Sequence, residues 1–428
     1  MDRVIVIGGG AAGMSAASRI RRLNEHVRIT VFERTPLVSH APCGIPYYIE
    51  GLFDDYSLFM TYTPQFFMEK RNIEVKTGVT VEEIETKDRK IYVNSNDKKE
   101  VEEYDYLVYA TGAKPAMPKF PVNGEVFLIH HPADAEEIRE KLWSTRKVII
   151  VGGGIVGVEM AEALTKKGKE VALLHRGKWI LNKVIDQDMA EEVQEEMKRV
   201  GVDLHLGEEV IEVNAEKVLT KSGEYKADAV ILGVGVKPNV QLLRDSVRIG
   251  ETGAVWTDQT MRTSDEYIYA VGDAAESINI VTGKRDWEPF APVANKMGYV
   301  AGSNIAGYPM KFPGVVGTII TKFNETFIGK TGAFIGTGVK IKGRTRARYY
   351  PGGTDIYVKL YVDEGSKRIT GGQIVGKEEV LGRVNTIASL ILKGGTVEDL
   401  FFSELGYLPA ISQVWDPLIV AARQFLRG

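Results

Sequence analysis

The chain of 428 residues contains a single cysteine, Cys43. One cysteine can form neither an intramolecular disulfide nor a multi-cysteine metal site, so any thiol chemistry runs through this residue. Pro42, Gly44 and Pro46 flank it, which predicts a rigid, non-helical approach followed by the start of a helix. A helix N-terminus stabilises a thiolate, the reactive form of cysteine. We therefore interpret Cys43 as a catalytic nucleophile, with a buried structural cysteine as the alternative.

A glycine-rich turn near the N-terminus predicts a dinucleotide site. Residues 4–7 form an apolar run typical of a buried strand, residues 8–13 read Gly-Gly-Gly-Ala-Ala-Gly, and a helix is expected over residues 14–23. A second strand is expected over residues 27–32 and ends at Glu33. This order of strand, turn, helix and strand is what makes a G-x-G-x-x-G pattern informative.

The positions within this turn have separate physical roles. Gly8 makes the tight turn, Gly10 lets the backbone approach a pyrophosphate, and Gly13 lets the helix pack closely on the strand. The phosphate lies on the free N–H groups at the helix start. Glu33, twenty residues after Gly13, is placed to accept hydrogen bonds from a ribose diol.

The same pattern returns in the second quarter of the chain. Residues 147–151 are an apolar strand, residues 152–157 read Gly-Gly-Gly-Ile-Val-Gly, and a helix over 158–167 precedes a strand over 170–174. Two complete patterns predict two dinucleotide sites. The alternative is a pair of glycine-rich turns that bind nothing.

The two patterns differ at the position that reads the ribose. Where the first has Glu33, the second has His175 followed by Arg176. Loss of the carboxylate removes the repulsion that excludes a 2′-phosphate, and Arg176 could pair with that phosphate. We therefore favour NADPH without excluding NADH; the alternative is that both side chains face solvent.

Composition limits the remaining classes. An apolar fraction of 44% and a charged fraction of 26% are typical of a globular protein, and the length indicates several domains. A net charge of −3 offers no footprint for nucleic acid, and no apolar run is long enough to span a bilayer. With no charged leader before the first strand, we expect a cytoplasmic protein without nucleic-acid or membrane partners.

Three further motifs accompany the two glycine-rich turns. Residues 106–112 form a strand ending in Ala-Thr-Gly, residues 229–239 form its counterpart after the second turn, and residues 268–273 read Ile-Tyr-Ala-Val-Gly-Asp. In this order the motifs resemble the pyridine nucleotide–disulfide oxidoreductase superfamily over the whole chain. The resemblance implies an α/β fold with two Rossmann-like domains, for FAD and NAD(P)H, and a C-terminal α+β dimerisation domain.

The order of the motifs also predicts domain boundaries. The FAD domain is expected to be discontinuous, over residues 1–112 and 244–318, with the NAD(P)H domain inserted at 113–243 and the dimerisation domain at 319–428. This interruption lets the two sites face each other, as hydride transfer between atoms roughly 3–3.5 Å apart requires. Strands alternating with helices are expected in the last domain.

The resemblance carries cofactor roles onto single positions. Asp273 corresponds to the aspartate that holds the ribityl chain of FAD, and Glu159, on the first turn of its helix, would orient the nicotinamide. The residues expected to bind FAD are Gly8, Gly10, Ala11, Ala12, Gly13, Glu33, Arg34, Val81, Thr111, Gly112, Asp273 and Ala291. The residues expected to bind NAD(P)H are Gly152, Gly154, Ile155, Val156, Gly157, Glu159, His175, Arg176 and Gly235.

Residues 39–47, Ser-His-Ala-Pro-Cys-Gly-Ile-Pro-Tyr, resemble the SxxxC motif of the single-cysteine branch of the superfamily. That branch contains coenzyme A disulfide reductases, NADH oxidases and peroxidases, and archaeal sulfur reductases. Its peroxidases and water-forming oxidases carry a histidine in the first glycine loop, where this chain has Ala11. The missing proton donor argues against dedicated peroxidase chemistry, although reduced flavin could still leak electrons to oxygen.

Positions on both sides of Cys43 match those that contact coenzyme A in the disulfide reductases. Three arginines would suit the phosphates of such a ligand, and a solvated basic stripe is the alternative. Pro42 stands where some members have an asparagine. The residues expected to bind the substrate are Ser15, Arg19, Arg22, Ser39, Arg71 and Asn295.

Two C-terminal segments resemble those that place tyrosines in the partner subunit's site. They carry Tyr349, Tyr350 and Tyr407, and a hydroxyl near a mixed disulfide could protonate the departing thiolate. Ordinary interface aromatics are the alternative. The family's YxPP run is altered here, because Ala410 replaces its second proline.

Together these features predict an FAD-dependent NAD(P)H:disulfide oxidoreductase. It would reduce coenzyme A disulfide, polysulfide or sulfur through Cys43, with coenzyme A as substrate or as an adduct of that cysteine. An NAD(P)H oxidase that reduces oxygen and a flavoprotein electron-transfer reductase for a protein partner stay open as alternatives. We expect a homodimer, or a dimer of dimers, with no metal site.

Overall fold

A five-stranded parallel sheet carries the N-terminal glycine turn. The computed structural model describes residues 3–95, 97–214 and 216–426. The sheet contains β1 (Arg3–Ile7), β2 (Arg28–Glu33), β3 (Glu74–Thr77), β7 (Tyr106–Tyr109) and β18 (Ile268–Ala270), in the order β18-β7-β1-β2-β3. All its neighbouring strands are parallel. Since β18 follows the second glycine turn in the sequence, this sheet is assembled from two separate parts of the chain.

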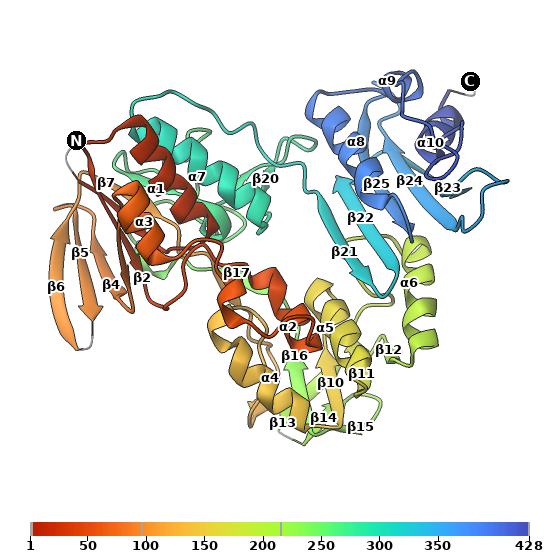
Figure 1. Cartoon of the computed structure of the whole chain (residues 1–428), viewed down its shortest axis with the longest axis horizontal. Helices are drawn as coiled ribbons and strands as arrows, with labels where there is room; N and C mark the ends of the chain where they lie inside the picture. The colour runs from red at the N-terminus through yellow and green to blue at the C-terminus, as the bar shows by residue number, and fades with distance from the viewer. Residues whose placement is uncertain (1–2, 96, 215, 427–428) are drawn as a thin grey trace.

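Helices cover this sheet on the side that Figure 1 shows in red and teal. The helices are α1 (Ala11–Leu23), α3 (Pro64–Arg71) and α7 (Ala291–Ile305). The opposite face of the sheet packs against an antiparallel ribbon of β4 (Thr80–Glu85), β5 (Lys90–Ser95) and β6 (Lys98–Glu103). Helices α1 and α7 lie in close contact, since a Cβ at Gly298 would lie 2.2 Å from the carbonyl oxygen of Ala12. Helix α1 begins three residues earlier than its predicted start at residue 14.

The second glycine turn lies on a four-stranded parallel sheet. Its strands are β10 (Lys147–Val151), β11 (Glu170–His175), β12 (Asp203–Leu206) and β16 (Ala229–Leu232), in the order β12-β11-β10-β16. Its helices are α4 (Ala135–Ser144), α5 (Ile155–Lys166) and α6 (Gln187–Val200). A smaller sheet contains β9 (Val122–Asn123), β13 (Val210–Asn214), β14 (Lys217–Thr220) and β15 (Glu224–Lys226). Helix α5 also begins three residues before its predicted start.

Two short strands connect the parallel sheets. Strand β8 (Ala113–Pro115) follows the Ala-Thr-Gly turn, and β17 (Val236–Pro238) follows the end of the second sheet. They pair antiparallel, with Pro238 opposite Ala113. The chain therefore leaves the first unit and returns to it along one ribbon, while the boundaries at 112/113, 243/244 and 318/319 stay predictions.

The C-terminal unit is an antiparallel sheet with helices that follow it. Its strands are β21 (Ile319–Phe323), β22 (Thr326–Gly332), β23 (Thr337–Arg344), β24 (Asp355–Val362) and β25 (Ile369–Gly376). Helices α8 (Val380–Leu392), α9 (Val397–Phe401) and α10 (Pro417–Gln424) come after them. The predicted alternation of strands and helices is wrong here. Five strands run consecutively, because hairpin connections need no intervening helix.

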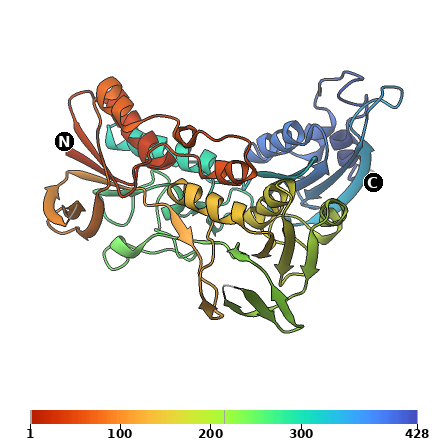
Figure 2. The ribbon, with the colours of Figure 1, turned by 60° about the horizontal axis from the view of Figure 1, so that its bottom comes forward.

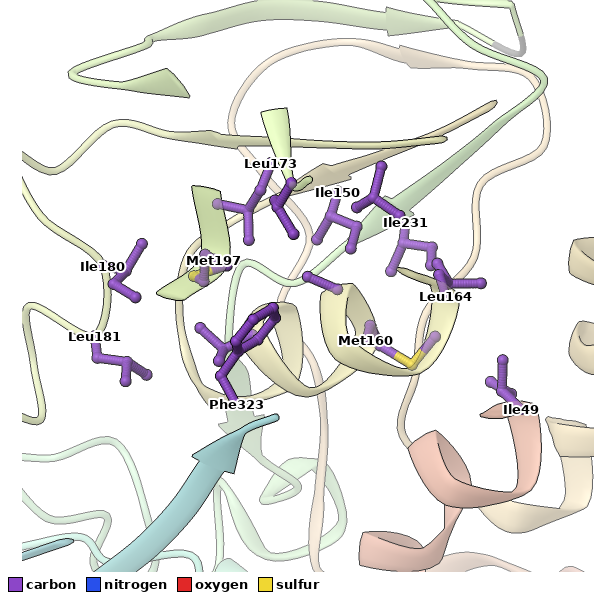
Figure 3. Close-up of a cluster of buried hydrophobic side chains, with 14 of the residues drawn as sticks. Ile49, Ile150, Met160, Leu164, Leu173, Ile180, Leu181, Met197, Ile231 and Phe323 are labelled. Atoms are coloured by element: carbon purple, nitrogen blue, oxygen red, sulfur yellow. The ribbon is translucent and has the colours of Figure 1, made fainter. Parts of the chain in front are cut away.

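The largest hydrophobic core crosses the units. It joins α5 and the second parallel sheet to β21, through Phe323, and to α2 (Ile45–Glu50), through Ile49. Figure 3 shows Phe323, at the end of β21, beside the helix that carries Met160 and Leu164. Figure 2 shows the yellow and green second unit beneath both others. Among the described residues, no helix has the length and apolar character needed to cross a bilayer.

Candidate active site

Cys43 lies where the first two units meet. It occupies a 3₁₀ turn, Pro42–Gly44, directly before helix α2. That helix is anchored in the core of the second unit, where Ile45, Tyr48 and Ile49 are at most 1% exposed. The helix start predicted after Cys43 is therefore confirmed, whereas the approach to it is a 3₁₀ turn and not the non-helical segment that was predicted.

The electrostatic surroundings of Cys43 favour the protonated thiol. Its side chain is reached by solvent but is surrounded by enough protein to be partly desolvated, and this burial is the largest cause that raises the pKa of the Cys43 thiol. The carboxylates of Glu159 and Asp273 raise this pKa further. Stabilisation of the thiolate by the following helix was expected, and it is outweighed because two negative charges and burial act in the opposite direction.

A cavity of about 460 Å³ opens beside Cys43. It is lined by Ala11, Met14, Ser15, Ser18, Arg22, Ser39, His40, Ala41, Pro42, Cys43, Thr61, Tyr62, Phe67, Arg71, Ala291, Asn295 and Tyr299. No carboxylate is among these lining residues, whereas two are arginines. The cavity therefore combines a thiol with a positively charged, partly aromatic wall, and an anionic ligand would fit it.

Five of the six predicted substrate residues line this one cavity. Ser15 and Arg22 lie on α1, with Ser18 between them on the same face, so this wall runs about 10 Å along the helix. Arg22 is exposed and makes no hydrogen bond or ion pair with another described residue. Arg71 donates to the hydroxyl of Ser18 over 2.5 Å and lies 5.3 Å from the ring of Tyr62. One arginine is thus free at the surface and the other is held in place.

Arg19 is the exception among the predicted substrate residues. Its Nε donates to Ser303 over 2.9 Å, and its guanidinium lies 4.2 Å from the centre of the Tyr299 ring. These contacts join α1 to α7 behind the cavity wall, and Arg19 does not line the cavity. It lies one helical step from the Ser15, Ser18 and Arg22 face, which the sequence pattern alone did not separate.

Sequence reasoning missed several residues of the cavity. Ser18, Tyr62 and Tyr299 all line it, as does His40, three residues before Cys43. The signal for Ser18 was present, because it lies three residues after Ser15 on a predicted helix. Tyr62 and Tyr299 come from separate segments, and no spacing rule connects them to α1.

The first glycine turn has the geometry that a pyrophosphate needs. A Cβ at Gly8, whose φ is +103°, would lie 2.2 Å from the carbonyl oxygen of Ala110, and one at Gly13 would lie 2.0 Å from that of Gly8. At the end of β2, Oε2 of Glu33 accepts from the N–H of Gly9 over 2.9 Å. Oε1 of Glu33 already accepts from the N–H and the hydroxyl of Thr35, over 2.8 and 2.9 Å. The second lone pair of Oε2 is therefore the one left for a ribose hydroxyl.

Asp273 is a second group whose surroundings suit FAD. It lies in a 3₁₀ turn, Gly272–Ala274, directly after β18. Burial raises the pKa of Asp273 to about 6, and its carboxylate accepts no hydrogen bond from another described residue. A half-buried acceptor in this state suits the hydroxyls of a ribityl chain.

The other positions predicted for FAD surround these two groups unevenly. Thr111 and Gly112 form the turn after β7, and the Thr111 hydroxyl donates to the carbonyl oxygen of Asn239 over 3.0 Å. Arg34 is exposed just beyond Glu33, and Val81 is buried in β4. Of the remaining four, Gly10 caps α1, and Ala11, Ala12 and Ala291 lie at the first turns of α1 and α7.

The second glycine turn, before α5, has a similar geometry. Gly154 caps α5, and a Cβ there would meet no atom within 4 Å, so a phosphate can approach the helix start, where the first N–H groups have no partner within the helix. Such a helix start suits a dinucleotide phosphate. Gly152 and Gly235 both have positive φ, +119° and +103°, as their turns require.

His175 and Arg176, at the end of β11, differ in their exposure to solvent. His175 is 9% exposed, and burial lowers its pKa, whereas Arg176 is exposed. A neutral imidazole and a free guanidinium therefore stand where the first unit has a carboxylate.

Glu159 lies in the second turn of α5 rather than the first, because the helix begins at Ile155. Its Oε1 accepts from the Thr321 hydroxyl over 2.7 Å. Burial raises the pKa of Glu159, and the nearby charge of Glu162 adds to that effect.

The three predicted catalytic tyrosines lie on the C-terminal unit, away from the Cys43 cavity of the same chain. The hydroxyls of Tyr349 and Tyr407 are 3.1 Å apart, and Tyr350 lies near Arg346. Tyr349 is 76% exposed. The chain by itself thus brings two of these tyrosines together but does not join them to Cys43.

Residues 2–298 match the family described as pyridine nucleotide-disulphide oxidoreductase, and residues 329–418 match the dimerisation domain of that family. The chain therefore belongs to the pyridine nucleotide-disulphide oxidoreductase family, and the predicted fold class is confirmed. Proteins of this family use FAD and NAD(P)H, which the two glycine turns fit.

Particular relatives are similar over nearly the whole chain. The NAD(P)H coenzyme A polysulfide/persulfide reductase of Pyrococcus horikoshii is 46% identical, over 98% of this chain and 98% of that protein. The coenzyme A disulfide reductase of Staphylococcus haemolyticus is 30% identical over 97% of each. A solved NAD-dependent persulfide reductase from A. fulgidus superposes with a TM-score of 0.94 at 36% identity, covering 99% of this chain and 83% of that one.

Proposed function

We propose that this protein is an FAD-dependent NAD(P)H:disulfide oxidoreductase that reduces coenzyme A disulfide, or polysulfide or sulfur, through Cys43. The observation that carries the proposal is the single cavity that joins Cys43 to Arg22 and Arg71. A substrate that combines a sulfur–sulfur bond with phosphate groups would meet both walls at once. The names of the relatives from Pyrococcus and Staphylococcus support the same substrate class.

The chemistry of Cys43 in this cycle is thiol–disulfide exchange. Its thiolate attacks one sulfur of the substrate, a new sulfur–sulfur bond forms to Sγ of Cys43, and the substrate's own bond breaks. The departing half leaves as a thiolate and takes a proton from solvent. FAD and NAD(P)H, held at the two glycine turns, would supply the electron pair for cleavage of the mixed disulfide, which releases the second thiol and restores Cys43. One cysteine suffices because the substrate's thiol takes the part of a second.

Replacement of Cys43 tests the proposal. Cys43→Ser should abolish NAD(P)H oxidation that depends on coenzyme A disulfide, while NAD(P)H oxidation with ferricyanide continues. Full disulfide-dependent turnover by this variant would refute the proposal. Intact-mass analysis of protein purified without reductant distinguishes the acceptors. A coenzyme A adduct on Cys43 supports the disulfide, added sulfur atoms support polysulfide, and one oxygen atom indicates an oxidase.

The C-terminal unit supports a homodimer as the working form. It exposes a group of apolar and aromatic side chains, here called the C-terminal patch: Tyr349, Tyr350, Phe402, Tyr407, Leu408, Ile411, Val414 and Trp415. A monomer rarely leaves so many large apolar side chains open, and residues 329–418 match a dimerisation domain. In our proposal a second copy covers the patch, and Tyr349, Tyr350 and Tyr407 reach the partner's Cys43 cavity.

The dimer has its own test. Trp415→Glu should shift the protein from dimer to monomer in light scattering and lower disulfide turnover with it. A variant that stays dimeric with full turnover would contradict this arrangement. Because the reaction uses a reduced nicotinamide and a free thiol, we place the enzyme in the cytoplasm.

A further inference from the structure

The hydroxyl of Thr321 makes a direct contact with the active-site helix. Its Oγ1 donates to Oε1 of Glu159 over 2.7 Å, from strand β21 of the C-terminal unit to helix α5 of the second unit. Thr321 is 5% exposed, and Glu159 is half-buried. A hydrogen bond shielded from water in this way holds both partners in one geometry.

The rest of β21 fixes Thr321 in place. Side chains alternate along a strand, so Ile319, Thr321 and Phe323 face the same side, and all three are buried. Phe323, fully buried, packs with Met160 of α5 in the core (Figure 3). The position of the Thr321 hydroxyl against Glu159 is therefore set by packing and not by the hydrogen bond alone.

Charges around the contact come from three elements. Lys322 of β21 pairs with the buried Glu162 of α5, which also pairs with Lys166 over 2.5 Å. Lys166 reaches Glu50, at the end of α2, over 3.3 Å. This network ties β21 and α5 to the helix that begins just after Cys43.

Glu159 in turn acts on the reacting thiol. Its negative charge raises the pKa of Cys43, after burial, and also raises the pKa of Tyr47 on α2. Burial and Glu162 raise the pKa of Glu159 itself, while the hydrogen bond from Thr321 and the charge of Lys322 lower it. The charge beside Cys43 thus depends on whether Thr321 keeps its partner.

We propose that Thr321 is a positioning residue for the reaction at Cys43, because its hydroxyl holds the carboxylate of Glu159 in one orientation on α5, the helix tied to α2 just after Cys43. The proposal rests on the proposed role of Cys43 as the reacting thiol. It makes the C-terminal unit, through β21, a direct contributor to the site within one chain. The hydrogen bond from Thr321 is one of the contacts that favour the ionised form of Glu159, so its loss weakens the negative charge that acts on Cys43.

The rate of alkylation of Cys43 tests this. Since the chain has one cysteine, iodoacetamide labelling of the reduced holoenzyme followed by intact mass reports on that thiolate alone. Thr321→Val should be labelled about threefold faster than the parent protein at pH 7, because a weaker negative charge near Cys43 leaves more of the thiol ionised. Glu159→Gln should be labelled at least as fast, and Thr321→Val should add nothing in that background.

Two controls separate positioning from packing. Thr321→Ser keeps the hydroxyl and should label at the parent rate. Thr370→Val removes another hydroxyl, 5% exposed in the same sheet, whose bond of 2.7 Å goes to the carbonyl oxygen of Ile335; it should label at the parent rate too.

Parent-like labelling of Thr321→Val across pH 6–9, with acceleration in Glu159→Gln, would overturn the role of Thr321. Parent-like labelling of Glu159→Gln would overturn it as well. Neither of these labelling measurements uses a disulfide substrate. Failure of the proposed function appears separately, as full disulfide turnover by Cys43→Ser.

Discussion

The backbone N–H of Gly153 donates a hydrogen bond of 3.1 Å to Nδ1 of His175. In the first unit the N–H of Gly9 donates to Glu33 in the same way, over 2.9 Å. The two side chains occupy equivalent strand ends and hold the middle glycine of their turns. The second unit keeps this contact without the negative charge, since burial lowers the pKa of His175 and leaves its imidazole neutral.

Arg176→Glu should change the choice of nicotinamide. The new carboxylate would repel a 2′-phosphate next to a neutral His175, so we expect KM for NADPH to rise about tenfold or more, with a smaller change for NADH. Steady-state kinetics with both nucleotides measures this. Lys226→Glu, an exposed charge reversal on β15, is the control. Equal changes for the two nucleotides would mean that Arg176 does not read the phosphate.

Asp273→Asn should stabilise the protein without FAD. The pKa of Asp273, about 6, lies above its ordinary value of 3.8, so the folded state binds more protons between about pH 4 and pH 6. Stability of the parent therefore falls as pH rises through that window. Asparagine removes this loss, so the free energy of unfolding in urea should rise by about 1–2 kcal/mol at pH 7 relative to the parent. At about pH 3.5 the two proteins should be equally stable.

The same variant should retain FAD less well, because the carboxylate acceptor is gone. Absorbance at flavin wavelengths after gel filtration measures this retention. Asp245→Asn, at an exposed position, should change neither property. If Asp273→Asn lowered the free energy of unfolding of the apoprotein at pH 7, burial of this carboxylate would not be destabilising.

Arg22 and Arg19 should differ although both lie on α1. Arg22→Ala removes an unpaired cation from the cavity, so we expect KM for coenzyme A disulfide to rise about tenfold. Arg19→Ala breaks the contacts with Ser303 and Tyr299, and should lower the melting temperature while KM stays within about twofold. Equal effects of the two variants on KM would place Arg19 in the substrate site.

Phe323→Ala should loosen the C-terminal unit from α5. The side chain is fully buried in the core that crosses the units, and truncation of such a phenylalanine costs about 3–5 kcal/mol. Thermal unfolding of the holoenzyme measures the loss. Phe327→Ala, on the neighbouring strand and 38% exposed, is the matched control and should cost far less. Similar losses would mean that the shared core contributes little.

Local features of the two glycine turns were predictable because short-range sterics dictate them. Gly8 and Gly13 admit no Cβ, so the turn can be recognised without any knowledge of the rest of the molecule. The helix starts were placed three residues late, because glycine is a poor helix former and the expected helices began after the last glycine. In the structure Gly13 and Gly157 lie inside the first turns of α1 and α5, because a glycine is needed there for close contact with the preceding strand and turn.

What the sequence by itself determined is the pair of dinucleotide turns, the acid at Glu33, its replacement by His175, and a lone thiol at Cys43. Each follows from residues close together in the chain. Only the tertiary structure decided which arginines face the cavity, and that Thr321, 162 residues after Glu159, holds its carboxylate. Such contacts depend on how whole elements pack, and so does the raised pKa of Cys43, because burial and distant charges set it.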